Sequence, residues 1–155
     1  MEVYSHATQW YWFNEPFFLN SFDIGSERYS SSAQPTVIDL HSESNGKIPR
    51  GIGAICLQLG ARDKNSSTDN CWVNLYRDPS SLYVLQRNIG TYNQVGPALP
   101  NDTWSQEQGI VPCDENGNIS FKCFASGDKT LDISIIVVGF AGCITSAPKP
   151  PTLTG

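Results

Sequence analysis

The side chains that most often carry catalysis are scarce in this sequence. His6 and His41 are its only histidines, and His6 lies in the N-terminal segment. A nucleophile that needs a histidine base would therefore have to use His41. No Gly-x-Ser-x-Gly elbow and no signature around a cysteine nucleophile is present. We expect a protein that is not an enzyme, and we predict that His41 is a surface residue at the end of a strand.

The stretch 114–118, Asp-Glu-Asn-Gly-Asn, is only faintly similar to a calcium-binding loop. An EF-hand loop needs oxygen ligands at positions 1, 3 and 5, glycine at position 6 and glutamate at position 12. Here glycine stands at position 4 and Ala125 at position 12. The Asn-Gly pair is explained more simply as the turn of a hairpin. Nothing points to a looser site built from Asp63 and Asp69, so we expect no metal and no cofactor.

The cysteines do not form a metal-binding or redox motif. Their number is odd, which leaves at least one thiol unpaired, and no Cys-x-x-Cys pair occurs. An unpaired cysteine usually behaves as a small apolar residue, so we predict buried free thiols within strands. The five are Cys56, Cys71, Cys113, Cys123 and Cys143.

Aromatic residues are the other resource for binding. Trp72 and Tyr76 share parity along a predicted strand, opposite to Val73 and Leu75. If Val73 and Leu75 face the core, the row Trp72, Asn74 and Tyr76 faces outward. Such a row could stack on a sugar ring, bury against another subunit, or be covered by the N-terminal segment. The sequence leaves these three alternatives open.

Regular strand signals begin at Pro35 and continue to Phe140. The predicted strands cover residues 36–41, 51–60, 71–76, 82–87 and 104–111, a hairpin over 112–123, and residues 131–140. Turn signals recur between them, and no segment longer than about ten residues carries a helical period. The sequence therefore predicts an all-β fold, an antiparallel β-sandwich or jelly roll of about eight strands.

The two ends differ from this body in composition. Residues 1–34 hold Trp10, Trp12 and four of the seven phenylalanines without a clean period. They predict an aromatic-rich N-terminal arm with one or two short strands, whose rings need a surface to bury against. Residues 141–155 contain several prolines and predict an extended C-terminal tail. The sandwich domain is then expected to span residues 35–140.

Charge and hydropathy argue against several kinds of partner. The formal net charge is −5 and basic residues are scattered, so the basic stripe of a nucleic-acid-binding protein is missing. No polybasic segment is present to hold an anionic membrane. The longest aliphatic run, residues 133–138, is too short to cross a bilayer. The N-terminus lacks the charge and apolar core of a signal peptide. We expect no nucleic acid, no membrane partner and synthesis in the cytoplasm.

The C-terminal third carries a series of turn and strand motifs. They are residues 110–121 (IVPCDENGNISF), 125–127 (ASG), 130–133 (TLDI) and 138–140 (VGF), and residues 48–51 (IPRG) precede an apolar strand upstream. This series resembles the closing module of small β-sandwich or jelly-roll virion proteins of tailed bacteriophages, which include capsid decoration (cement) proteins and tail-associated accessory proteins. The likeness covers roughly residues 35–140. It implies a non-enzymatic virion role, often as a trimer on the capsid surface.

Our first hypothesis is a virion structural protein, made in the host cytoplasm, that binds the outside of a phage capsid and stabilises it. It would act as a homotrimer and contact the major capsid protein or another virion protein. The residues expected to bind partners or other subunits are Trp10, Trp12, Phe13, Phe17, Phe18, Trp72 and Tyr76. The alternative is a carbohydrate-binding module or lectin-like domain of a tail fibre. A hydrolase would need a cleft near His41 or two carboxyl groups about 5–10 Å apart.

Overall fold

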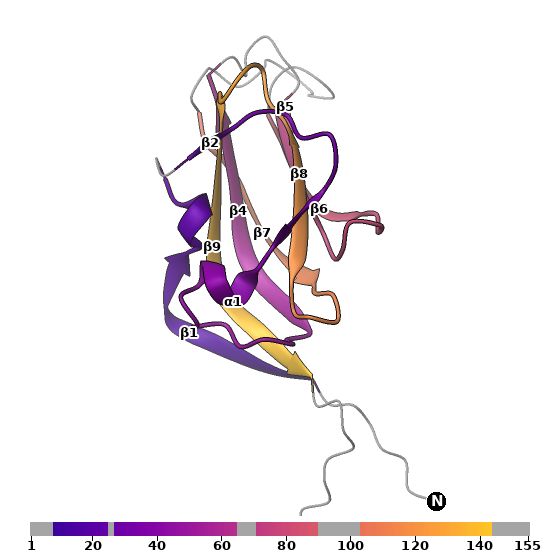
Figure 1. Ribbon diagram of the computed structural model, residues 1–155. Coiled ribbons are helices and arrows are strands. Elements are labelled where there is room, and N and C mark those ends of the chain that lie inside the picture. Colours follow the sequence, from indigo (N-terminus) through magenta and orange to yellow (C-terminus); the bar gives the residue numbers. More distant parts are fainter. Residues whose placement is uncertain (1–7, 25–26, 65–70, 90–102, 144–155) are drawn as a thin grey trace, which may run out of the picture.

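The computed structural model describes residues 8–24, 27–64, 71–89 and 103–143. They form two antiparallel sheets packed face to face, which confirms the predicted β-sandwich (Figure 1). The strands are β1 (Thr8–Phe18), β2 (Arg28–Tyr29), β3 (Thr36–Ile38), β4 (Ala54–Asp63), β5 (Cys71–Tyr76), β6 (Tyr83–Ile89), β7 (Ser105–Pro112), β8 (Ile119–Phe124) and β9 (Leu131–Cys143), with a 3-10 turn η1 (Asn20–Phe22) and a short helix α1 (Leu40–Glu43). One sheet has the order β1-β9-β4-β7, with β2 also paired to β9, and the other has the order β3-β8-β5-β6.

The core lies between the sheets and is built by alternation along their inner strands. Leu131, Ile133 and Ile135 on β9 are buried, as are Val73 and Leu75 on β5. Each such side chain contributes about 1.5–3 kcal/mol when it leaves water. Apolar residues recur with a period of two along these strands, and this made the strands predictable from the sequence.

The sequence predicted an N-terminal arm apart from the sandwich, but the first described residues form a strand of the five-stranded sheet. Strand β1 pairs with β9 from Thr8 opposite Cys143 to Phe18 opposite Ile136. The register shifts between Trp12 and Phe17, where Pro16 sits in an edge strand that tolerates its missing N–H. Because this irregularity breaks the period of two, the sequence pattern does not reveal a strand of this length.

The boundaries at both ends of the predicted body also differ from the structure. Leu19 and Phe22, from the predicted arm, are buried in the core. Residues 141–143, from the predicted tail, complete β9. The rest of the predicted tail, residues 144–155, lies outside the described residues.

The Asn116-Gly117 turn is present, but the strands on either side of it do not form the predicted hairpin. Gly117 N donates to Asp114 O at 3.0 Å, and Gly117 has φ of 81°. Strand β7 before the turn belongs to the five-stranded sheet, and β8 after it belongs to the four-stranded sheet. The turn therefore carries the chain from one sheet to the other, which local turn chemistry cannot distinguish from a hairpin.

Substituting alanine at Gly117 is expected to destabilise the fold more than the same change at Gly51. Both glycines have positive φ, at 81° and 76°, which costs an L-residue about 1–2 kcal/mol. A Cβ at Gly117 would lie 2.5 Å from Gly51 N and 2.7 Å from Ile52 N, whereas a Cβ at Gly51 would meet nothing within 4 Å. The backbone clash adds roughly 1–3 kcal/mol. Urea denaturation of Gly117→Ala and Gly51→Ala would measure the difference, and equal losses would contradict it.

Candidate interaction surfaces

His41 lies in the short helix α1 rather than at the end of a strand. Asp39 Oδ1 caps this helix by accepting from Ser42 N at 3.1 Å. The Nδ1 atom of His41 is 2.9 Å from Ile48 O, so the ring ties the helix to the loop that follows. A helix of one turn has no detectable period in the sequence, and this is why it was missed. His41 has the surroundings of a structural residue.

Asp63 is buried, and its carboxylate holds a turn through hydrogen bonds. It accepts hydrogen bonds from Ser126 N at 3.0 Å, from the Ser126 hydroxyl, and from Thr130 Oγ1 at 3.0 Å. These donors belong to the turn between β8 and β9, so Asp63 at the end of β4 fixes that turn to the five-stranded sheet. Asp69, its companion in the looser calcium site considered above, lies outside the described residues.

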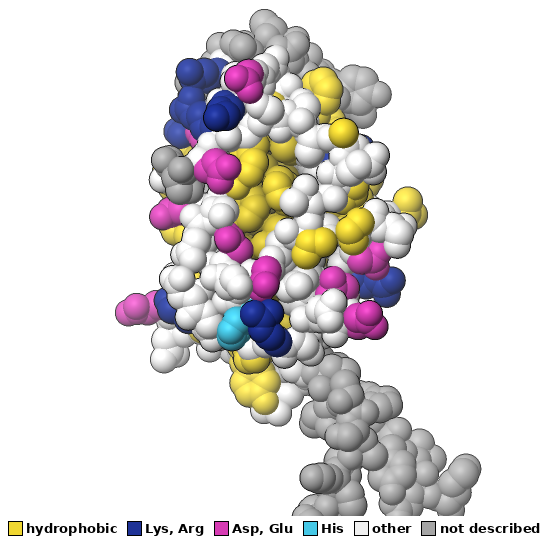
Figure 2. Space-filling view, viewed as in Figure 1, with side chains coloured by type: hydrophobic (Ala, Val, Ile, Leu, Met, Phe, Trp, Pro, Cys, Tyr) yellow, Lys and Arg dark blue, Asp and Glu magenta, His cyan; other side chains and the backbone are white. Residues whose placement is uncertain are grey.

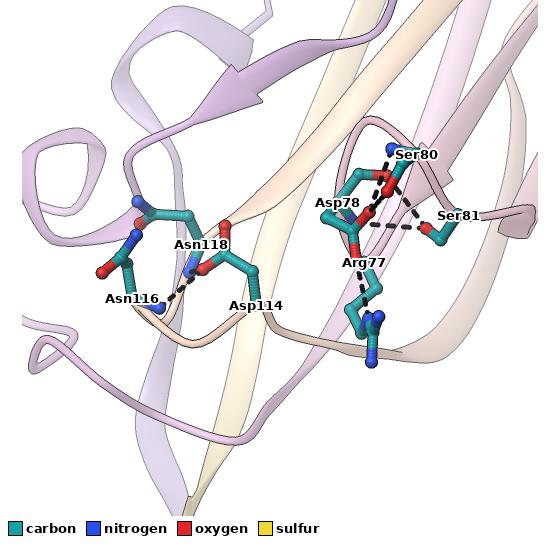
Figure 3. A network of polar contacts seen from close by, with 7 residues as sticks. All are labelled: Arg77, Asp78, Ser80, Ser81, Asp114, Asn116 and Asn118. Carbon is teal, nitrogen blue, oxygen red and sulfur yellow. Dashed lines mark hydrogen bonds and ion pairs between the residues drawn. The ribbon is translucent and has the colours of Figure 1, made fainter.

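Two further carboxylates hold turns at the surface (Figure 3). Asp114 Oδ1 accepts from the backbone N–H groups of Asn116 and Asn118, both at 2.9 Å. Asp78 Oδ1 accepts from Ser80 N at 2.9 Å and Ser80 Oγ at 2.7 Å. The hydrogen bonds from Ser80 are the main cause of a lowered pKa at Asp78. Within the described ranges, no group of three or more His, Cys, Asp or Glu side chains is placed to hold a metal ion.

The thiols that the structure describes are buried, as predicted. Cys56, Cys113 and Cys123 are free cysteines in or beside strands. Burial, and then the negative charge of Asp114, raises the pKa of Cys113 to about 12. A thiol with this pKa is protonated at neutral pH and is a poor nucleophile.

Trp10 and Trp12 lie on the outer face of the five-stranded sheet. Their rings stack with centroids 5.3 Å apart and an interplanar angle of 12°. Trp12 is opposite Gly139 on β9, and a Cβ on that glycine would lie 2.5 Å from Trp12 Cε3. The Trp12 ring therefore covers the glycine, and 58% of the residue remains exposed.

Two rows of apolar residues cross this outer face from one edge of the sheet to the other. The first row is Trp12, Gly139, Cys56 and Ile110, and the second is Trp10, Ala141, Ala54 and Pro112. We call these eight residues the outer apolar patch. Its centre is made of small residues and its two margins of bulky ones, and Ile110 is 51% exposed. Nothing in the sequence around Ile110 distinguishes it as a contact residue, because residues 104–111 carry only weak strand signals.

The opposite end of the same face is charged. Asp132 is buried and lies between two arginines, with Oδ1 3.2 Å from Arg28 Nε and Oδ2 2.7 Å from Arg62 Nη2. The Arg62 guanidinium also lies 4.7 Å from the centre of the Trp104 ring. Since Arg62 already covers one face of this ring, Trp104 offers little free aromatic surface to a ligand.

The other aromatic residues predicted as contacts in the N-terminal segment divide between two environments. Phe13 and Phe17 meet edge to face at 4.9 Å and pack against the core. Phe18 is opposite Ile136 and is half-buried, next to the outer apolar patch. Tyr11, which was not among the predicted contacts, stacks on Phe140 at 5.2 Å and is 45% exposed. The core therefore takes part of the aromatic surface that we had assigned to partners.

The predicted outward row on β5 differs from the structure. Val73 and Leu75 do face the core, but Asn74 and Tyr76 are also buried, and only Trp72 is half-exposed. Strand β5 lies inside its sheet between β8 and β6, so neighbouring strands flank its outer side chains. Trp72 stacks on Phe124 at 6.2 Å.

No protein-family model matches the chain, and no curated protein matches it. A chain of the tomato aspermy virus structure is 14% identical with a TM-score of 0.38, and the match covers 98% of this chain and 82% of that one. An isomalto-dextranase of Arthrobacter globiformis is 16% identical with a TM-score of 0.29, over 86% of this chain and 23% of that one. TM-scores this low carry no inference about function. No helix in the described part of the chain is long and apolar enough to span a membrane.

Proposed function

We propose that this chain is a virion structural protein that binds the outside of a phage capsid and stabilises it, as a homotrimer whose subunits meet through the outer apolar patch. The observation that supports the proposal is the patch itself, two apolar rows that cross all four strands of the sheet order β1-β9-β4-β7. Trp12 and Ile110 at the margins of the patch are exposed, whereas Cys56 and Ala141 between them are buried. Exposed apolar side chains grouped on one face of a folded domain are typical of a protein–protein interface. The capsid and the trimer come from the resemblance of residues 35–140 to phage virion proteins.

The position of β1 adds a second means of association. It is an edge strand, and within the described residues it pairs only with β9. Because no described strand pairs with its other edge, the N–H and C=O groups there can pair with another chain. A partner that covers Trp10 and Trp12 would lie directly beside these groups. Apolar contact and main-chain hydrogen bonds would then act at one interface.

We expect the full chain to be oligomeric in solution and the variant Trp12→Glu/Ile110→Glu to be monomeric. The two carboxylates would have to be buried in the interface without partners, which is strongly unfavourable. Sedimentation equilibrium measures the mass, and circular dichroism verifies that the variant is folded. Leu82→Glu is the matched control, because Leu82 is 88% exposed and lies outside the patch.

A wild-type chain that stays monomeric and does not bind to capsids would contradict the proposal. Electron microscopy of the native particle tests capsid binding: the wild-type protein should occupy the capsid surface, and the double variant should not.

Carbohydrate binding is the second candidate, favoured by the Trp12 ring that lies over Gly139 with much of its surface exposed. A flat exposed indole is suited to stacking on the apolar face of a sugar. A glycan array would detect this function. Trp12→Ala should remove glycan binding, and Trp12→Phe should retain part of it. Glycan binding by a monomeric chain would favour this candidate over the capsid-binding role.

A further inference from the structure

A pocket of about 370 Å³ lies between the η1–β2 segment and β3. Its aromatic lining residues are Phe22, Tyr29 and Phe121, and Glu27, Asp39 and Glu43 provide its carboxylates. Tyr29 is the most accessible of the three rings, because Phe22 and Phe121 are only 3% and 7% exposed. Figure 2 shows an apolar hollow near the centre of the face that it draws, with acidic side chains around the hollow. The volume is at the small end for a ligand site and suits one side chain better than a large molecule.

The aromatic rings form a fixed cluster. Phe22 stacks on Tyr29 with centroids 5.5 Å apart and an interplanar angle of 7°, and Phe121 meets both rings edge-on at 5.2 and 5.5 Å. The Tyr29 hydroxyl donates to Ser21 O at 2.6 Å, which fixes its ring. Aromatic faces attract a cation through their quadrupole, and this attraction strengthens where water is partly excluded.

The charge around the pocket is negative. Glu43 accepts from Ser21 N at 2.7 Å and from Ser21 Oγ at 3.0 Å, so both its oxygens are held at the pocket wall. Asp39 lies 3.5 Å from Arg50 Nη1, which offsets one of the three carboxylates. Burial first, and then the charges of Glu27 and Glu43, raises the pKa of Tyr29. An incoming cation would meet two carboxylates that no described lysine or arginine neutralises.

The strand that borders the pocket has a free edge. β3 pairs with β8, from Thr36 opposite Phe121 to Ile38 opposite Ile119, and no other described strand pairs with it. Val37 and Ile38 line the pocket, so the free edge of β3 opens onto it. An extended segment that adds to this edge would place alternate side chains over the aromatic cluster.

We propose that this pocket binds a basic side chain, arginine or lysine, carried by an extended segment of a partner protein that adds as a strand to β3. Charge selects the basic residue, the aromatic cluster holds its stem and cationic head, and main-chain hydrogen bonds to β3 set its register. The site is separate from the outer apolar patch, so it does not depend on the function proposed above.

The test is a titration of the ¹⁵N-labelled full chain with the peptide acetyl-Thr-Val-Arg-Val-Thr-amide. We expect amide shifts at residues 36–39 and around Phe22 and Tyr29. A peptide with citrulline in place of arginine has the same shape without the charge and should bind at least about tenfold more weakly. Glu27→Gln and Glu43→Gln should each weaken binding about three- to tenfold. The control Glu115→Gln, in a different turn, should leave it unchanged.

Glu43 also holds Ser21, so Glu43→Gln is interpreted only if its thermal midpoint matches wild type. Glu27→Gln changes an exposed residue and keeps the test decisive. Equal binding of the citrulline peptide, or shifts confined to the outer apolar patch, would overturn the basic-side-chain site. Undiminished binding of a peptide whose amide toward β3 is N-methylated, or equally tight binding of arginine amide alone, would overturn the strand addition.

Discussion

Replacing Asp63 by alanine is expected to lower the free energy of unfolding by about 3–5 kcal/mol, because hydrogen bonds to a charged acceptor contribute about 1.5–3 kcal/mol each. The buried carboxylate accepts from Ser126 N, Ser126 Oγ and Thr130 Oγ1, and alanine leaves these donors without their acceptor. The turn before β9 then loses its attachment to β4. Equilibrium urea denaturation measures the change.

The matched control is Asp78→Ala. The Asp78 carboxylate also accepts from a backbone N–H and a hydroxyl, both of Ser80, but it does so in a surface turn. Water can replace the lost acceptor there, so we expect a much smaller change. If the two variants lose similar stability, burial is not what makes Asp63 important. Asp63→Asn should resemble alanine, because its amide NH₂ would face donors.

Replacing Gly139 by alanine is expected to detach β1 from β9 and, with it, to remove the oligomerisation proposed above. The new Cβ would lie 2.5 Å from Trp12 Cε3 and 2.6 Å from Tyr11 O. The tryptophan ring can turn away, but the carbonyl is backbone, so the strands themselves must separate. The overpacking costs roughly 1–3 kcal/mol. Tryptophan emission should shift to the red, and protease should cut β1 faster than in wild type.

Gly142→Ala is the control on the same strand. Among the described residues its Cβ would meet only Tyr11 Cε2, at 3.3 Å, and this ring can move. The double variant Trp12→Ala/Gly139→Ala should recover only part of the stability, since the contact with Tyr11 O remains. Full recovery would show that the ring alone causes the strain, and a Gly139→Ala chain as stable as wild type would contradict the predicted separation.

The sequence predicted the strands best where apolar and polar residues alternate regularly and the apolar ones face one core. β5 was predicted with its observed bounds, and β9 from its observed first residue. One or two short strands were predicted in the N-terminal segment, but the full length of β1 escaped prediction because the irregularity around Pro16 breaks its period. The change of sheet at Asn116-Gly117 was missed because the geometry of a turn is local, whereas the choice of sheet depends on distant strands.

The interaction surfaces were predicted only in part, since they depend on which strands become neighbours. Trp10 and Trp12 drew attention as aromatic residues, but their partners across the sheet, Cys56 and Ile110, come from β4 and β7. The pocket combines residues from η1, β2, β3 and β8. No spacing in the sequence connects Tyr29 to Phe121. Such sites become visible only once the register of the strands is known.

The place of β9 in its sheet has a consequence for how the molecule folds. β9 is the strand that joins β1 and β2 to β4, and its pairing with β1 unites residues from opposite ends of the described chain. The β5–β6 pair is local and can form early, but the five-stranded sheet must wait for the closure of a very long loop. Folding on the millisecond-to-second scale is expected for such pairing. During this delay the aromatic residues of β1 are exposed, which makes nascent chains the species most prone to aggregate and the natural clients of chaperones.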